Sequence, residues 1–415
     1  MTRQLAALVL CALAVATSGA AQPSFSVSFG QGLESLQAPG ETSDSQNSLA
    51  GAGSVQYLFA DERARVFYDL AISTYASPGD WRTVAHEAGG RYRFDLGSSD
   101  QHHLFTGGSV VLRRNGDSWD AADYDAVGGF ANLEVHPSAT SVVRTGYRLD
   151  VRRFPTFTPL DQLEQSAFAS ALVNFQTKTT IIGEVGVGAK HYEGSAGYTT
   201  VVAGGGSTVL AGGNGGSGGG QGNGGAHGVA GQAGIMQSLM TEPVAVPGSP
   251  STDARLVTVL VRVAQSLASR TGLSLELQRR ETFGDVPPAV VATPARFFDD
   301  GVYDDPYASD STLARVSLKS IVWHDLELAA NGSWQDKPYG ATPAFDANGD
   351  PIEGVLRHDR VVRASARAVF PLAPSRTGAF DVDLVCGYDF TRDRSTTAAY
   401  TYTSHAVGIG FQVGY

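Results

Sequence analysis

The chain has 415 residues, a formal net charge of −11 at pH 7 and 17% charged residues, fewer than the roughly one quarter that is usual in soluble domains. The acidic balance argues against a nucleic-acid-binding protein. Glycine is abundant, with 50 residues, and methionine is rare. No segment sustains the 3.6-residue apolar period of an amphipathic helix for more than a turn or two, so the composition and periodicity predict an all-β fold.

The N-terminus has the three-part layout of a secretory signal peptide. Arg3 gives a basic start, an apolar stretch follows over 5–15, and small residues precede a cleavage point near Ala21. We therefore expect an exported protein with a cleaved signal peptide over 1–21 and a mature domain over 22–415.

Apolar and polar residues alternate repeatedly along the mature chain, which is the pattern of half-buried strands. Most of these segments reach the roughly 9–11 residues that a tilted membrane strand needs. No apolar run of about 18 residues, as a membrane-spanning helix requires, follows the N-terminal segment. In chain order we predict sixteen strands, with fourteen as the alternative, around 25–29, 55–59, 66–72, 92–96, 110–112, 124–135, 143–151, 168–175, 181–189, 257–263, 273–277, 314–318, 326–330, 362–370, 380–390 and 407–415.

The connections between these strands alternate between short and long. Short ones fall near 61–62 and 136–140, and long ones near 31–50, 282–310 and 336–357. Outer-membrane barrels have short periplasmic turns and longer outer loops, and closure of the sheet leaves no unpaired edge in hydrocarbon. We predict a closed antiparallel transmembrane β-barrel with long outer loops, and with both termini on the short-turn side because the strand number is even.

The longest connection, 191–252, contains a low-complexity segment. Half of the residues of Ala203–Gly234 are glycine. Such a composition cannot bury enough apolar surface to offset the entropy of ordering it, so we expect a flexible outer loop.

The final strand alternates strictly. Val407, Ile409, Phe411 and Val413 are apolar, the residues between them are small or polar, and the chain ends on Tyr415. This pattern resembles the C-terminal assembly signal of bacterial outer-membrane β-barrel proteins, a porin-like superfamily. The resemblance covers only this strand and points to no single family. It implies a location in the outer membrane, contact with its lipid, and recognition by the barrel-assembly machinery during biogenesis.

Charged residues occupy the strand positions between the apolar ones. An arginine facing lipid at mid-depth costs about 2–4 kcal/mol, so these residues are expected to face the lumen. Sixteen strands leave an aqueous channel, whose charged lining sets its selectivity. We therefore hypothesise a porin-like channel for passive or facilitated passage of small hydrophilic solutes, with the arginines favouring anions. The candidate lumen-lining residues are Arg144, Arg148, Arg152, Arg363, Arg367, Asp381 and Asp383.

Alternative interpretations remain open. The arginines could instead pair with Asp381 and Asp383 across the lumen and hold its shape. The barrel could anchor a surface binding or structural protein that uses its outer loops, or export an acidic polysaccharide. The sequence leaves the oligomeric state open.

No catalytic, cofactor or metal site is predicted. No Ser-His-acid order or nucleophile elbow suggests an enzyme, and removal of the signal would leave Cys386 as the single cysteine. Aromatic residues near predicted strand ends, among them Tyr92, Trp334 and Tyr400, are interpreted as girdles at the two membrane interfaces.

Overall fold

The computed structural model describes residues 21–37, 44–59, 63–75, 82–97, 101–116, 123–156, 158, 161–193, 198–202, 206–210, 252–284, 305–346, 351–373 and 381–414. The predicted signal peptide lies outside these residues except for Ala21, as do Tyr415 and most of Ala203–Gly234. No helix in the described ranges is long and apolar enough to cross a membrane.

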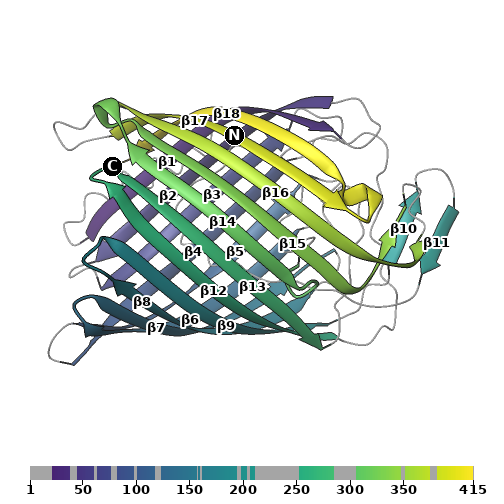
Figure 1. The fold of residues 1–415 in the computed structure, drawn as a ribbon, viewed down its shortest axis with the longest axis horizontal. Coiled ribbons are helices and arrows are strands. Elements are labelled where there is room, and N and C mark those ends of the chain that lie inside the picture. Colours follow the sequence, from purple (N-terminus) through teal and green to yellow (C-terminus); the bar gives the residue numbers. More distant parts are fainter. Residues whose placement is uncertain are drawn as a thin grey trace.

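Sixteen strands form one closed antiparallel barrel (Figure 1). Neighbours in the chain are neighbours in the barrel, with β9 next to β12 and β18 next to β1. The prediction of sixteen strands is therefore confirmed. The barrel strands are β1 (Ala21–Gln37), β2 (Asp44–Phe59), β3 (Ala64–Tyr75), β4 (Arg82–Leu96), β5 (His102–Asn115), β6 (Tyr124–Ser138), β7 (Ser141–Arg153), β8 (Gln162–Asn174), β9 (Thr179–Tyr192), β12 (Thr252–Ala268), β13 (Thr271–Gly284), β14 (Ser311–Ile321), β15 (Glu327–Phe345), β16 (Pro351–Ala373), β17 (Asp381–Ser395) and β18 (Tyr402–Gly414).

The two ends of the barrel differ in their connections. At one end β6 and β7 are joined by residues 139–140, and β12 and β13 by 269–270. At the other end β9 and β12 are joined by 193–251, and β13 and β14 by 285–310. The start of β1 and the end of β18 pair with each other at the short-turn end.

The prediction of a long loop over 336–357 is wrong. β15 continues to Phe345 and β16 begins at Pro351, so only 346–350 connect them. Pro338 and Pro343 interrupt the alternation that marks a strand, since neither can donate an amide hydrogen bond. The ladder accommodates them by shifting register at both positions instead of ending. β1 and β2 likewise extend into the predicted loop 31–50.

Four short elements lie outside the barrel wall. β10 (Tyr198–Val202) and β11 (Gly206–Leu210) pair as a separate two-stranded sheet within the longest connection, and Figure 1 places them beyond the end of the barrel opposite the C-terminus. The 3-10 turns are η5 (Trp323–Asp325) and η6 (Ala398–Tyr400).

Candidate functional site: the two faces of the barrel wall

Alternation sorts the side chains of each strand onto two faces. On β18, Val407, Ile409 and Phe411 are more than half exposed. Ser404 and Ala406, which have the opposite parity on the same strand, are buried. The other strands repeat this arrangement, with exposed large apolar residues that include Val127, Tyr147, Val187, Leu277, Val316 and Tyr388. We call the face that carries them the apolar face and the opposite one the polar face.

The three predicted arginines of β7 lie on the polar face. Arg144 Nε donates to Glu134 Oε2 on β6 at 2.6 Å, and Arg148 Nη2 donates to Asp150 Oδ1 at 2.9 Å. The guanidinium of Arg152 lies 4.5 Å from the centroid of the Tyr124 ring. The carboxylate partners of Arg144 and Arg148 are therefore neighbours in the wall, which balance these two charges locally.

The second predicted group lies on β16 and β17. Arg363 is opposite Thr391 and Arg367 is opposite Gly387, so the register places no carboxylate directly across from either arginine. Neither arginine makes an ion pair within the described part of the chain, and Arg367 Nε is buried without a hydrogen-bond partner there. Asp383 lies on β17 and Asp381 at its first residue. Arg367 still interacts electrostatically with Asp383 without forming an ion pair. Arg363 and Arg367 are therefore less closely balanced by carboxylates than Arg144 and Arg148 are.

A row of alternating charge crosses four further strands. The register places Arg262 of β12 opposite Glu276 of β13, and Glu276 opposite Arg315 of β14. Arg262 Nε donates to Glu276 Oε2 at 2.7 Å, and Arg315 Nη1 lies 3.3 Å from Glu276 Oε1. On β9, Glu184 lies opposite Leu260, next to Arg262. This part of the polar face contributes little net charge.

A segment of the β13–β14 connection is docked on the polar face of β8 and β9. The side chain of Lys190 is only 1% exposed, and its Nζ lies 3.8 Å from Glu164 Oε2 and 4.0 Å from Asp305 Oδ2. The Tyr192 hydroxyl donates to Asp305. The Tyr307 hydroxyl donates to Glu164 Oε1 at 3.4 Å. We call the segment 305–310, held in this way, the docked segment.

Burial, together with the charge of Glu164, raises the pKa of the Tyr307 hydroxyl well above its ordinary value. Tyr307 therefore remains a hydrogen-bond donor throughout the physiological pH range. The docked segment was not predicted, because the sequence of 282–310 indicates only an outer loop. Nothing in the local pattern of Asp305 or Tyr307 indicates contact with strands more than a hundred positions earlier in the chain.

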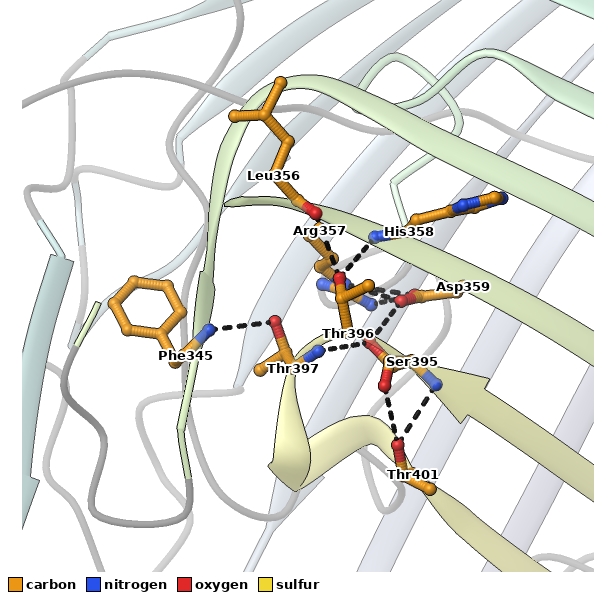
Figure 2. Close-up of polar contacts among 9 residues, drawn as sticks. All are labelled: Phe345, Leu356, Arg357, His358, Asp359, Ser395, Thr396, Thr397 and Thr401. Carbon is orange, nitrogen blue, oxygen red and sulfur yellow. Dashed lines mark hydrogen bonds and ion pairs between the residues drawn. The ribbon is translucent and has the colours of Figure 1, made fainter. Parts of the chain in front are cut away.

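A second buried polar cluster holds the wall near the ends of β15 to β18. Arg357 Nε donates to both oxygens of Asp359 at 3.1 and 3.0 Å, and Ser395 Oγ donates to Asp359 Oδ1 at 2.6 Å (Figure 2). The Arg357 guanidinium lies 3.5 Å from the centroid of the Tyr400 ring and 4.2 Å from that of Tyr339. The interpretation of Tyr400 as an interfacial girdle residue is wrong, because η6 turns its ring onto the buried arginine.

Threonines of the β17–β18 connection complete this cluster (Figure 2). The backbone amide of His358 donates to Thr396 Oγ1 at 2.8 Å, and that of Phe345 donates to Thr397 Oγ1 at 3.3 Å. The connection is thereby tied to both β15 and β16. These contacts make the cluster a structural support for this end of the barrel.

No group of three or more histidine, cysteine, aspartate or glutamate side chains among the described residues is placed to hold a metal ion. The predicted assembly signal is described up to Gly414, and its residues Val407, Ile409 and Phe411 lie on the apolar face. Val413 shares their parity and is half-buried.

Comparison with known proteins gives a likeness of architecture only. No protein-family model matches the sequence, and no curated protein matches it. Similar solved structures include OccK8 (OprE) of Pseudomonas aeruginosa, with a TM-score of 0.47, 9% identity and coverage of 95% of this chain and 98% of that one. OpdQ of the same organism has a TM-score of 0.47 and 7% identity, with coverage of 95% of this chain and 98% of that one. A loop L8 deletion mutant of OmpT, an outer membrane protein of Vibrio cholerae, has a TM-score of 0.39 and 10% identity. The alignment covers 95% of this chain and 100% of that one.

Proposed function

We propose that this chain is an outer-membrane porin-like channel for passive passage of small hydrophilic solutes, with a preference for anions. The observation that carries the proposal is the sorting of side chains on a closed sixteen-strand wall: large apolar residues are exposed on one face and charges lie on the other. Water disfavours such an apolar exterior, whereas lipid favours it and penalises charges placed there.

The polar face then lines the lumen. A barrel of 16–18 strands is wide enough to leave an aqueous passage, whereas one of about eight strands is filled by its own side chains. The docked segment lies over the polar face of β8 and β9, where it narrows this passage from one side. The contacts of Lys190 with Asp305 and Glu164 hold it there.

The anion preference is argued from the arginines that form no ion pair in the described part of the chain. Arg144 and Arg148 each form an ion pair with a carboxylate of the same wall. Arg363 and Arg367 form none within the described ranges, although Asp383 interacts with Arg367 electrostatically. Rings of fixed charge bias which ions enter a pore. Arg363 and Arg367 are therefore the residues that we expect to attract anions.

Planar-bilayer recordings test both parts of the proposal. The purified, folded protein should give discrete single-channel currents and, in a salt gradient, a reversal potential on the anion-selective side. The variant R363Q/R367Q should shift that potential towards cation selectivity. The matched control E134Q/R144Q removes one charge of each sign and should leave it nearly unchanged. A folded protein that never conducts would refute the channel proposal. An R363Q/R367Q channel with the wild-type reversal potential would refute only the proposed role of these arginines in anion preference.

A further inference from the structure

Three arginines form a cationic cluster on the apolar face, near the end of the barrel that carries the long connections. Arg360 lies on β16, and Arg392 and Arg394 lie on β17. Arg360 shares its parity with exposed Val362, and the other two share theirs with exposed Tyr388. All three are exposed, although charges elsewhere on the strands lie mostly on the polar face. We call these three residues the arginine cluster.

The strand register stacks the cluster directly above an apolar layer. One rung runs from Asp336 on β15 through Arg360 to Arg394. The next rung towards the middle of the barrel runs from Trp334 through Val362 to Arg392. Trp334 and Val362 are both exposed, so the cluster lies where the apolar band meets the rim of the barrel.

The positive charge of the cluster exceeds what its neighbours balance. Arg360 and Arg394 are directly opposite each other, and like charges in opposed cross-strand positions destabilise a sheet. Asp336 Oδ1 lies 3.2 Å from Arg360 Nε and also 2.9 Å from the His358 ring. Arg392 and Arg394 make no ion pair within the described ranges. Asp336 is thus shared between Arg360 and His358, while the guanidinium groups of Arg392 and Arg394 have no carboxylate partner within these ranges.

We propose that the arginine cluster binds the phosphate groups of lipid headgroups in the outer leaflet. The planar guanidinium fork matches phosphate oxygens in a bidentate fashion, and opposed arginines can share one phosphate. The exposed tryptophan beneath the cluster occupies the depth at which such rings mark a membrane interface. A lipid, unlike free phosphate, satisfies both layers, because its acyl chains contact Trp334 and Val362 while its headgroup meets the arginines. The proposal rests on the proposed membrane location and is independent of channel activity.

Native mass spectrometry of the folded protein, released from detergent with added lipid, tests the proposal. The probes are lipid A carrying two phosphates and the same lipid after dephosphorylation. Wild-type protein should bind the phosphorylated form more tightly, and its affinity should fall as salt is added. The variant R360Q/R392Q/R394Q should lose roughly 100-fold in affinity, since each basic residue at a charged membrane surface contributes about fivefold.

The control variant R114Q/R270Q/R279Q removes the same charge from three exposed arginines that have carboxylate partners, namely Asp125, Asp325 and Glu281. It should retain the wild-type affinity. Equal binding of both lipid forms, or equal affinity in the cluster variant and the wild type, would overturn the proposal. Displacement of the lipid by millimolar inorganic phosphate would overturn the assignment to a lipid headgroup. Single-channel recordings on the same preparations distinguish failure of the lipid-binding proposal from failure of the channel proposal, because the cluster variant should conduct like the wild type.

Discussion

Replacing Gly188 by alanine should release the docked segment without changing any charge. Gly188 lies on β9 beneath Tyr307, and a Cβ atom there would overlap the Tyr307 hydroxyl and lie 3.1 Å from the ring carbon Cζ. The neighbouring polar-face glycine, Gly186, is a matched control. A Cβ atom at Gly186 meets only Ala167 O at 3.8 Å and Thr258 Cβ at 3.9 Å, which are ordinary contacts.

The size of the effect follows from the overlap. Inserting a methyl group into a packed contact typically costs about 1–3 kcal/mol. If that cost falls on the docked position of Tyr307, it raises the population of the released position by roughly 5- to 150-fold. Release removes Asp305 and Tyr307 from Lys190, whose side chain is 1% exposed when the segment is docked. The amine should then become accessible to water-soluble reagents in proportion to the released fraction.

Acylation of Lys190 by a water-soluble ester, followed over time by peptide mass spectrometry, measures this fraction. Exposed Lys319 serves as the internal reference, since its labelling should be the same in all variants. We expect Gly188→Ala to label Lys190 faster than the wild type, and Gly186→Ala to label it at the wild-type rate. Equal rates in the two variants would refute the docking contact. A larger single-channel conductance in Gly188→Ala would further support a docked segment that narrows the lumen.

Three other predictions concern the wall and its connections. Asp359→Asn leaves Arg357 buried without its charge partner and should lower the free energy of unfolding by about 3–5 kcal/mol. The loss is measured as a lower unfolding temperature in detergent. A loss below about 1 kcal/mol would show that the aromatic rings alone hold the arginine. Phe411→Arg, on the apolar face, should impair membrane assembly by about 2–4 kcal/mol. Gln412→Arg, one position on and on the polar face, should still give the heat-modifiable folded form. Equal folded yields of the two variants would contradict the assignment of faces. Deleting 203–234 removes β11 but no strand of the barrel, so the folded yield and unfolding temperature should match the wild type, and a failure to fold would show that this segment supports the wall.

The strand number and the assignment of faces could be predicted because both depend on a local property. Side chains of a strand alternate with a period of two, so the positions of Val407, Ile409 and Phe411 determine their common face whatever strand lies next to them. Arg144 and Arg148 lie on the opposite face from the apolar side chains of β7 for the same reason. The strand could not be predicted at the outer end of β15, because Pro338 and Pro343 break the alternation there without ending the strand.

The pairing of charges could not be predicted, because it depends on register. Parity gives the face of a residue and not its height relative to the next strand. Arg144 meets Glu134, whereas Arg363 meets Thr391, and no local pattern distinguishes the two arginines. Docking of Tyr307 depends on a contact of still longer range.

The seam of the barrel joins the two ends of the described chain, with Ser26 of β1 opposite Gly414 of β18. The entropy lost in closing so long a loop is a small obstacle, since each doubling of loop length costs only about 0.6 kcal/mol. The larger obstacle is that every partial wall has two open edges, and each unpaired amide in hydrocarbon costs several kcal/mol. Any intermediate that lacks β18 is therefore excluded from the lipid interior, however many hairpins it has already formed. Insertion and closure must consequently be coupled, and both require β18, which pairs with β17 on one side and β1 on the other.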